Sequence, residues 1–506
     1  MGKKLETAMI FGDHMVLQRQ KPIRIWGSCE GDGPVRISLA GQETTAECTD
    51  GRWEAVLPPM EAYEGLELVV SSGDETFRFT DVAVGEVWLA AGQSNMEFYL
   101  RYDAERKDAE ENPKIRMFDY PEVAFEGQLE QGDYSDYGFW RVCQSENLDY
   151  FSAAAYYFAM KIQKRYQVPV GIVGCSWGAT PACAWMDPAY LEDNEGKVWL
   201  EDYQKVLDEL DTEAYEKEYQ SNPEHFRQKP FENELNEAMM YGVTPEELGR
   251  IIQDMLSRGE SIAQTEGPKS EKRPGGLYGS MVKKIAPYPV CGVLWYQGEN
   301  DEKHADVYDT VLSRLIRCWR DLWGEELPFC IVQLAPFRYW DQEHMDLYPA
   351  LRRAQDQVSR EVPAVWVASI MDEGVETDIH PKKKRPVGER LALLARGHVY
   401  GEEILCDPPE CRNLTVEDGR LILIFDNAGE GLEIRGERVE ALVITCDGKG
   451  LEDYGTRIEK DSLIIESPEI EKEKKVCVRF AETDFCIVNL YSSIGLPAKP
   501  FTKYGD

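Results

Sequence analysis

Two patterns of hydrophobic and polar residues divide the chain. From about Met9 to Asp81, short apolar runs such as "PIRIWG", "VRISLAG", "RWEAVLP" and "LELVVSS" are separated by Gly, Asp and Ser. Closely spaced runs with turn residues between them are typical of β-strands. The pattern predicts a small β-sandwich, or a similar all-β unit, over residues 1–84.

From Val82 the runs become continuously apolar and alternate with helical patterns such as "SAAAYYFAMKIQKRY". The strand-like runs are "EVWLAAG", "VPVGIVGCS", "VCGVLWYQG", "PFCIVQLA" and "AVWVASI". Continuous apolar strands separated by helices are typical of a parallel sheet that helices cover on both faces. The sequence therefore predicts an α/β domain over residues 85–400.

Strand patterns return after the amphipathic stretch "ERLALLARGHVYG", which Gly401 ends. The runs "RLILIF", "ALVITC", "SLIIES" and "KVCVRF" predict a β-rich region over residues 401–506. We therefore expect an α/β domain flanked by all-β regions at both ends.

A segment without strand patterns interrupts the predicted α/β domain at residues 186–272. Trp199, Tyr203 and Leu207 recur there at helical spacing. Further on, "TPEELGRIIQDML" offers Thr244 as N-cap and Glu247 as the partner of a capping box. These patterns predict a helical insertion, which is either a surface decoration or a lid.

The charge balance excludes several classes of partner. The 506 residues carry 92 acidic and 56 basic side chains, a formal net charge of -36. Such a surface repels phosphate backbones and anionic lipids, so we expect neither nucleic acid nor a membrane as partner. The composition gives no oligomeric state.

The amino terminus and the cysteines bear on the compartment. The stretch "MGKKLETAMIFGDHMVLQ" has no apolar run long enough for a signal peptide, so the sequence predicts a cytoplasmic protein. The 13 cysteines are scattered singly, without CxxC spacing. This usage favours reduced thiols over a disulfide scaffold and does not suggest a cysteine-based metal site.

Two serines compete as the nucleophile of a hydrolase. Ser176 lies in "GCSWG", which fits the G-x-S-x-G elbow of lipase-like α/β-hydrolases, but no HGGG-like oxyanion loop precedes it. Ser94 lies in "GQSN", where the apolar run "VWLAA" ends. Each serine could equally lie in an ordinary turn at the end of a strand.

Two further strand ends carry polar residues suited to catalysis. Among the six histidines, His380 follows the run "AVWVASI", with Asp378 two residues earlier. A carboxylate and a histidine on one loop can form the base of a catalytic triad. In "LWYQGEND", Gln297 could donate an amide N–H to an oxyanion. Structural roles are the alternative for each residue.

These stretches resemble a known family. "GQSNM", "GCSWGATPACAW", "GVLWYQGEND" and "DIHPKKKRPVGERLA" are similar to the four catalytic blocks of the sialate O-acetylesterases, in the SGNH-hydrolase superfamily. The opening "FGDHMVLQRQKPIRIWG" and the closing "NLYSSIGLPAKPF" also resemble that family, so the similarity spans nearly the whole chain.

The resemblance implies an SGNH-type parallel sheet sandwiched by helices, and it implies roles for individual residues. Ser94 would be the nucleophile, His380 the general base and Asp378 the acid that orients it. The oxyanion hole would use the backbone N–H of Ser94, the N–H of Gly178 and the Gln297 side chain. The family's chemistry requires neither a metal nor another cofactor.

The chain departs from the family pattern at three places. Thr377 occupies the position, three residues before the histidine, where the superfamily usually has its acid, so Glu376 or Asp372 could replace Asp378 as the partner of His380. Gln297 stands where the superfamily name implies asparagine. Ala179 stands where relatives usually have the second glycine of Gly-Gly-Thr.

The resemblance implies removal of O-acetyl groups from sugars, and O-acetylated sialic acid is the expected substrate. Acetyl xylan or another plant polysaccharide is the alternative. A lipase-like hydrolase that uses Ser176, or a catalytically degenerate carbohydrate-binding protein, would be further possibilities. Arg352 and Arg353 could contact a sugar carboxylate or form a surface pair on a helix, whereas Trp185 and Trp295 could stack on a sugar but fit a core better.

Overall fold

The fold is known from a computed structural model, which describes residues 5–30, 33–193, 195–221, 231–259, 265–338, 347–417, 419–471 and 475–505. His225 and His344, two of the six histidines, lie outside these residues. The chain forms two compact units: Met1–Trp295 with Ser313–Phe329, and Tyr296–Leu312 with Cys330–Asp506. Among the described residues, no helix is both long and apolar enough to span a bilayer.

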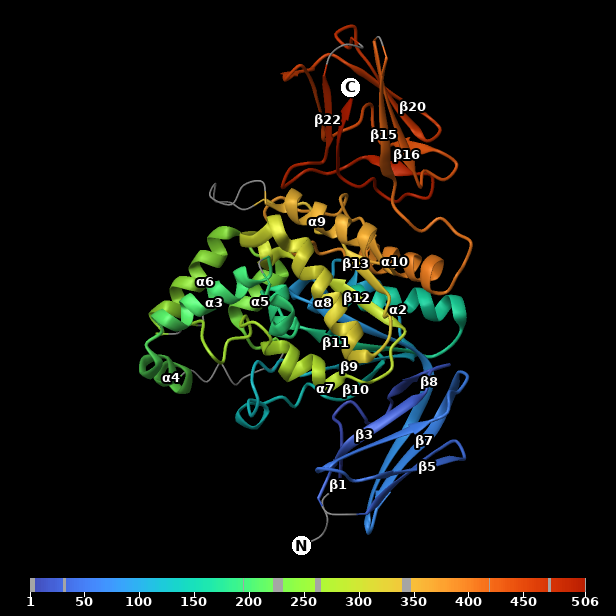
Figure 1. Ribbon diagram of the computed structural model, residues 1–506, viewed down its shortest axis with the longest axis vertical. Helices are drawn as coiled ribbons and strands as arrows, with labels where there is room; N and C mark the ends of the chain where they lie inside the picture. Colours follow the sequence, from blue (N-terminus) through green and yellow to red (C-terminus); the bar gives the residue numbers. More distant parts are fainter. Residues whose placement is uncertain are drawn as a thin grey trace. The chain divides into compact units, whose positions relative to one another are not determined.

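The amino-terminal part of the first unit is all-β, as predicted (blue in Figure 1). One sheet has the order β1-β3-β6, and β4 pairs with both β5 and β7. Alternation along β6 buries Trp53, Ala55 and Leu57. The strands are β1 (Leu5–Thr7), β3 (Ile23–Cys29), β4 (Pro34–Leu39), β5 (Gln42–Glu47), β6 (Arg52–Leu57) and β7 (Tyr63–Ser72).

A single strand, β8 (Glu75–Gly92), joins this β region to the α/β part of the same unit. Its first half pairs with β7 in antiparallel fashion, and β2 (Val16–Gln18) pairs with Ala83–Gly85 in parallel. From Glu86 onward β8 pairs with β11 (Val170–Ser176). The domain boundary placed after residue 84 falls inside this strand, and the division into three domains stays a prediction.

The α/β part of the first unit contains a mixed sheet. Its strand order is β10-β9-β11-β8-β12, with β9 (Asn112–Asp119), β10 (Trp140–Cys143) and β12 (Gly292–Tyr296). β11 is parallel to β8 and β9, whereas β10 is antiparallel to β9. The expectation of an all-parallel sheet is therefore wrong at this edge, because β10 returns beside β9 without the helical crossover that a parallel neighbour needs.

Helix α2 (Ala153–Tyr166) confirms the predicted helix and contacts β9 and β11. The Ser152 hydroxyl accepts the N–H of Ala155 at 3.3 Å and caps its amino end, and Gln167 ends the helix in the left-handed conformation at φ 58°. Polar caps of this kind satisfy backbone groups that the helix itself leaves unpaired.

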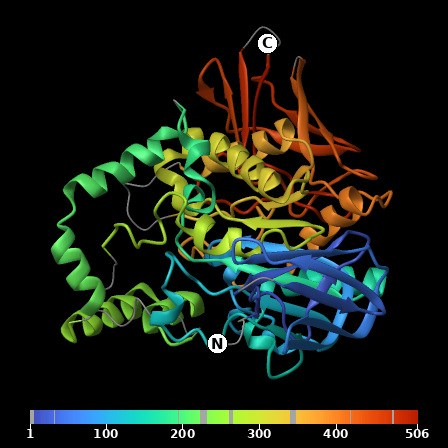
Figure 2. The same cartoon turned by 60° about the horizontal axis from the view of Figure 1, so that its bottom comes forward.

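The predicted insertion is helical, and the described residues between 186 and 272 contain no strand (green in Figure 2). The capping box is present: Thr244 Oγ1 accepts the N–H of Glu247 at 3.3 Å, and Glu247 Oε2 accepts the N–H of Thr244 at 3.1 Å. The helices are α3 (Lys197–Glu209), α4 (Thr212–Ser221), α5 (Glu234–Tyr241) and α6 (Pro245–Ser257).

The second unit contains strands β13 (Phe329–Val332) and β14 (Val365–Ala368), with α9 (Tyr348–Glu361) and α10 (Arg385–Leu394) against β14. A π-helical turn, Ala395–Val399, follows α10, and Gly401 ends the helical segment at φ 70°.

The carboxyl-terminal β region has two four-stranded sheets, in the orders β15-β16-β21-β20 and β19-β18-β22-β24, and a two-stranded sheet, β17-β23. A buried apolar cluster in this region includes Leu421, Leu463 and Phe480 (Figure 1). The four strands predicted here are confirmed as β16 (Arg420–Asp426), β18 (Leu442–Cys446), β21 (Ser462–Glu466) and β22 (Val476–Phe480). The other strands are β15 (Glu410–Glu417), β17 (Leu432–Ile434), β19 (Lys449–Gly450), β20 (Gly455–Glu459), β23 (Leu490–Ser492) and β24 (Phe501–Gly505).

The cysteines depart from expectation at one pair. Cys29 and Cys48 form a disulfide, with their Cα atoms 6.3 Å apart, and the other 11 cysteines are free. The preference for reduced thiols over a disulfide scaffold therefore holds for these 11 cysteines and is wrong for Cys29 and Cys48. The sequence separation of 19 gives no pairing signal, because only the folded chain brings the two cysteines together.

The capping box on α6 gives a test of the insertion. We expect Thr244→Ala to destabilise α6 by about 1 kcal/mol, because the Glu247 N–H loses its acceptor. Hydrogen exchange of the α6 amides measures this local change. Ser257→Ala, at the other end of the same helix, is the matched control, since its hydroxyl bonds only an exposed helical carbonyl. Equal exchange in both variants would contradict the capping role.

Candidate active site

Ser94 lies where strand β8 turns into a helix. The buried run of β8 ends at Gly92, whose φ of 140° favours glycine, and the short helix α1 (Ser94–Glu97) begins two residues later. Ser94 itself is 8% exposed. A strand–turn–helix junction is the backbone context in which a hydrolase presents its nucleophile.

Ser176 lacks that context. It is the last residue of β11 and pairs in register with Gly92 of β8. The next helical element is the 3₁₀ turn Ala182–Trp185, and the next α-helix is α3. The G-x-S-x-G pattern therefore marks the end of a strand, and the structure gives no support to a lipase-like elbow at Ser176.

The loop after β11 brings Gly178 against Ser94. A Cβ atom added to Gly178 would lie 3.3 Å from Ser94 Cβ, so the absent side chain lets the two segments approach closely. The N–H of Gly178 donates to Glu97 Oε2 at 2.8 Å. The amide expected to stabilise an oxyanion is thus bound to a carboxyl group on the helix that starts at Ser94.

Two further contacts hold this loop in place. Thr180 Oγ1 donates to the carbonyl of Trp177 at 2.7 Å and accepts the indole N–H of Trp185 at 3.0 Å. Ala179 adopts a left-handed φ of 55°, which fits the glycine that relatives usually carry there. This left-handed conformation at a residue with a side chain costs the loop some strain.

A cluster of acidic side chains surrounds Glu97. Burial, and then the charge of Asp119, raise the pKa of Glu97 to about 8. Burial also raises the pKa of Asp119 to about 6, although Arg141 opposes the shift, and it raises the pKa of Glu122 well above its usual range. Groups with such pKa values keep their protons, wholly or in part, at neutral pH.

The fold makes room for this cluster at Gly174. This residue of β11 pairs with Asp119 of β9, and a Cβ on Gly174 would lie 2.5 Å from Asp119 Oδ1. Tyr99 donates its hydroxyl to Asp119 Oδ2 at 3.3 Å. Sequence reasoning missed these acids, and the signal that could have revealed them is the presence of Asp119 and Glu122 in the otherwise apolar "MFDYPEVAF".

In the second unit, hydrogen bonds fix the side chain of Gln297 at the end of β12. Its Nε2 donates to Asp301 Oδ2 at 2.5 Å, and Tyr308 donates its hydroxyl to Gln297 Oε1 at 2.8 Å. The acceptor Asp301 Oδ2 and the donor hydroxyl of Tyr308 together determine which end of the amide is the nitrogen. Gly298, at φ 146°, allows the sharp turn that follows.

His380 lies in the loop after β14 and is 6% exposed. Asp378 Oδ1 accepts the backbone N–H of His380 at 3.0 Å, and Asp378 Oδ2 lies 3.0 Å from Lys382 Nζ. The carboxylate of Asp378 therefore holds the turn that carries the histidine.

The other two candidate acids have different partners. Arg390 binds both oxygens of Asp372, at 2.7 and 2.8 Å. Glu376 pairs with Arg338 at 3.2 Å, and both side chains are largely exposed. Of the three acids, Asp378 is the one whose carboxylate bonds the His380 residue itself.

The two arginines considered either as sugar contacts or as a surface pair have structural partners. Arg352 is fully buried and donates to four backbone carbonyls, including those of Leu334 and Asp484. The expectation of an exposed pair is wrong for Arg352, because the helix turns it inward. Arg353 forms an ion pair with Glu482.

Trp185 and Trp295 are fully buried, with ring centres 6.4 Å apart, which confirms them as core residues.

The structure thus brings Ser94 and Gly178 together in the first unit. Gln297, Asp378 and His380 belong to the second unit, in which Asp378 and His380 share one turn. The roles of these five residues in catalysis stay a prediction.

Comparisons with known proteins show which proteins this chain is similar to. A family model described as "Carbohydrate esterase, sialic acid-specific acetylesterase" matches residues 258–395. A mouse sialate O-acetylesterase is 26% identical over 87% of this chain and 82% of its own length, and the human protein is 26% identical over 83% and 76%. The crystal structure of a carbohydrate acetylesterase from Xanthomonas citri covers 99% of both chains, at 28% identity and a TM-score of 0.76.

The chain is therefore a carboxylic ester hydrolase of the carbohydrate esterase class. Its resemblance to the sialate O-acetylesterases is confirmed by the family model, by the mouse and human relatives and by the solved structure. These comparisons support an activity on O-acetylated carbohydrates.

The raised pKa of Glu97 predicts a stability that depends on pH. A carboxyl whose pKa rises from 4.5 to about 8 on folding stabilises the protein fully below the lower value, and this contribution is lost as the pH rises through the upper one. We expect Glu97→Gln to flatten the fall of the urea midpoint between roughly pH 5 and 8. The exposed Glu67→Gln is the matched control. A slope that Glu97→Gln leaves unchanged would contradict this assignment.

Proposed function

We propose that this chain is an SGNH-type serine esterase that removes O-acetyl groups from sugars, with O-acetylated sialic acid as its substrate. The observation that carries the proposal is the position of Ser94, at a strand–turn–helix junction with Gly178 against it. The names of the similar proteins support the acetyl group as the group removed and a carbohydrate as its carrier.

The proposed mechanism has two steps. Ser94 Oγ attacks the acetyl carbonyl while His380 takes the hydroxyl proton, and the sugar then leaves with that proton. Water repeats the sequence on the acetyl-serine and releases acetate. Asp378 keeps the base in place, a role that its bond to the backbone N–H of His380 supports.

Three donors would stabilise the oxyanion: the backbone N–H of Ser94, the N–H of Gly178 and Nε2 of Gln297. The bonds from Gln297 to Asp301 and Tyr308 support this role, because they fix the amide before substrate arrives. A donor that is already oriented does not have to be ordered during the reaction.

The bond between Gly178 and Glu97 adds a step to this scheme. With a pKa of about 8, Glu97 is mostly protonated at neutral pH, and its carboxyl oxygen is a weaker acceptor than a charged oxyanion. The Gly178 N–H can therefore move from Glu97 to the substrate oxygen as negative charge develops there. An ionised Glu97 would compete for the amide and repel the oxyanion.

Two observations bear on the substrate. The family model and the mammalian relatives carry sialic acid in their names, which favours a sugar with a carboxylate. The net charge of -36 opposes the approach of an anion, and the burial of Arg352 removes one candidate contact. A neutral acetylated polysaccharide such as acetyl xylan is therefore the second candidate.

The choice of nucleophile can be tested with p-nitrophenyl acetate. We expect Ser94→Ala to lower kcat/KM by a factor of at least about 10³, since it removes the attacking oxygen. We expect Ser176→Ala, the matched serine at the end of the neighbouring strand, to change it by less than about threefold, with circular dichroism as the check on folding in both variants. Loss of activity in Ser176→Ala alone would overturn the proposal in favour of an elbow hydrolase.

The choice of substrate can be tested with salt. Because the protein repels anions, kcat/KM for an O-acetylated sialic acid should rise between about 20 and 200 mM NaCl, as screening weakens the repulsion. The methyl ester of the same sugar, which is neutral, should show no rise, and neither should acetylated xylo-oligosaccharides. Efficient turnover of the xylo-oligosaccharides alone would favour the second candidate.

A further inference from the structure

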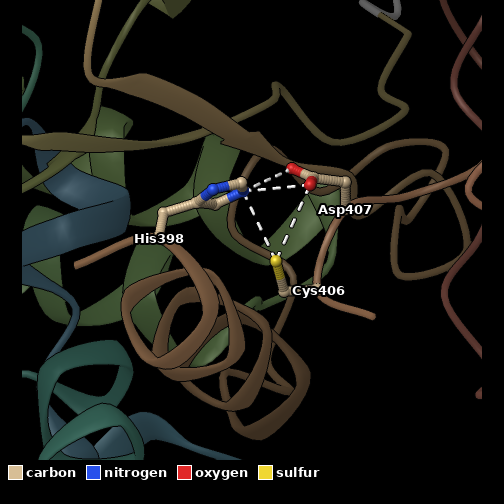
Figure 3. Close-up of side chains that lie close together, drawn as sticks. All are labelled: His398, Cys406 and Asp407. Atoms are coloured by element: carbon tan, nitrogen blue, oxygen red, sulfur yellow. Dashed lines mark hydrogen bonds and ion pairs between the residues drawn. The ribbon is translucent and has the colours of Figure 1, made fainter. Parts of the chain in front are cut away.

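A cluster of three metal-ligating side chains lies in the second unit, at the turn that follows α10 and in the next loop (Figure 3). His398 Nε2 lies 2.9 Å from both carboxylate oxygens of Asp407 and 3.3 Å from Cys406 Sγ. Cys406 Sγ lies 3.6 Å from Asp407 Oδ2. The nitrogen, sulfur and oxygen atoms of three different side chains therefore lie within 3.6 Å of one another.

Hydrogen bonds hold the three groups together when no ion is bound: one Nε2–H can be shared by both oxygens of Asp407, and the Cys406 thiol donates to Asp407 Oδ2. The same nitrogen, sulfur and oxygen atoms also have the spacing that a metal ion requires. A tetrahedral zinc ion with ligands at about 2.0–2.3 Å separates those ligands by roughly 3.3–3.6 Å from one another. The observed separations differ from that geometry by only a few tenths of an ångström.

The surroundings hold the three groups in this arrangement. Gly397 leaves the space that the thiol occupies, since a Cβ at this position would lie 2.3 Å from Cys406 Sγ. The indole of Trp366 stacks on the His398 ring at 4.5 Å between centres and 5° between planes, which fixes the ring orientation. Neighbours that orient a ligand are typical of metal sites.

The cluster is also accessible from solvent. The side chains of His398 and Asp407 are 25% and 32% exposed, whereas Cys406 is buried. An ion can reach the three donor atoms from this open side, and a water molecule can occupy a fourth position. Mixed nitrogen, sulfur and carboxylate donors suit zinc better than calcium or magnesium, which prefer oxygen.

A cysteine nucleophile is the alternative reading of the same residues, and the geometry disfavours it. In a catalytic triad the carboxylate bonds one ring nitrogen and leaves the other for the nucleophile. Here Asp407 bonds Nε2, the nitrogen that also faces Cys406. The ring therefore cannot pass a proton between the thiol and the carboxylate through its two nitrogens.

We propose that His398, Cys406 and Asp407 bind one divalent cation of the zinc type, with water as the fourth ligand. Binding replaces the thiol proton, which is released to solvent, with the metal ion. The site connects the end of α10 to the loop that leads into β15, so the ion acts as a clip between two segments. The esterase mechanism proposed above does not depend on it.

No sequence motif indicates this site. The three ligands stand at positions 398, 406 and 407, without the CxxC or HxxxH spacing of familiar metal motifs. The expectation that the chain has no cysteine-based metal site rested on spacing alone. The turn at Ala395–Val399 and the loop after Gly401 bring the ligands together only in the folded chain.

Cobalt(II) is a suitable probe, because a thiolate bound to it gives a ligand-to-metal absorption band in the near ultraviolet. We expect the full-length protein, stripped with EDTA, to take up one equivalent of Co²⁺ with such a band, and Zn²⁺ to displace it. Cys406→Ser should abolish the band, and Asp407→Asn should weaken binding by more than about tenfold, with esterase activity retained in both.

His14→Gln is the matched control. His14 forms a comparable pair with Asp81, at 2.8 Å, in the amino-terminal β region. Its removal should leave cobalt uptake unchanged. The proposal is overturned if the wild-type protein shows no thiolate band, if Cys406→Ser retains it, or if His14→Gln loses it. Should Cys406→Ser fail to fold, the wild-type spectrum and Asp407→Asn still decide the question.

Discussion

The position of Ser94 depends on the pairing of strand β8. Along its length β8 is held by β7, β2 and β11 in turn, and its second half is completely buried. A strand with partners on both sides cannot slide, because a shift of one residue would turn its buried side chains to the opposite face. Gly92 then releases the chain from the sheet at one fixed point.

Burial also changes the protonation of the acidic side chains beside Ser94. Burial raises the pKa of all three carboxyl groups, so at neutral pH Glu97 and Glu122 keep protons that exposed carboxyls would have lost, whereas Asp119, with a pKa of about 6, is mostly ionised. A reaction that develops negative charge at Ser94 would therefore meet less repulsion than the number of nearby acids suggests. Because Glu97 bonds the Gly178 amide, its protonation state affects a group proposed to act in the reaction.

Sequence patterns predicted the elements better than the site. The apolar runs around β8, β11 and α2, and the capping box of α6, are local signals, and the structure confirms them. The antiparallel β10, the Cys29–Cys48 disulfide and the inward turn of Arg352 depend on contacts between distant segments, which periodicity does not reveal. The family motifs are local as well, and they indicated Ser94 and His380. The contacts of Glu97 and of His398 join residues that no motif connects, so only the folded structure revealed them.

Arg352 has a consequence for how far the chain can be divided. Burial lowers the pKa of its guanidinium to about 10. The guanidinium donates to four backbone carbonyls, and two of these, the carbonyls of Thr483 and Asp484, belong to the carboxyl-terminal β region. A fragment that ended before residue 401 would lack half of these acceptors together with the backbone that carries them, so the buried environment of this cation would be lost. The carboxyl-terminal β region thus supplies hydrogen-bond acceptors to a charged side chain of α9, and it cannot be deleted without loss of those acceptors.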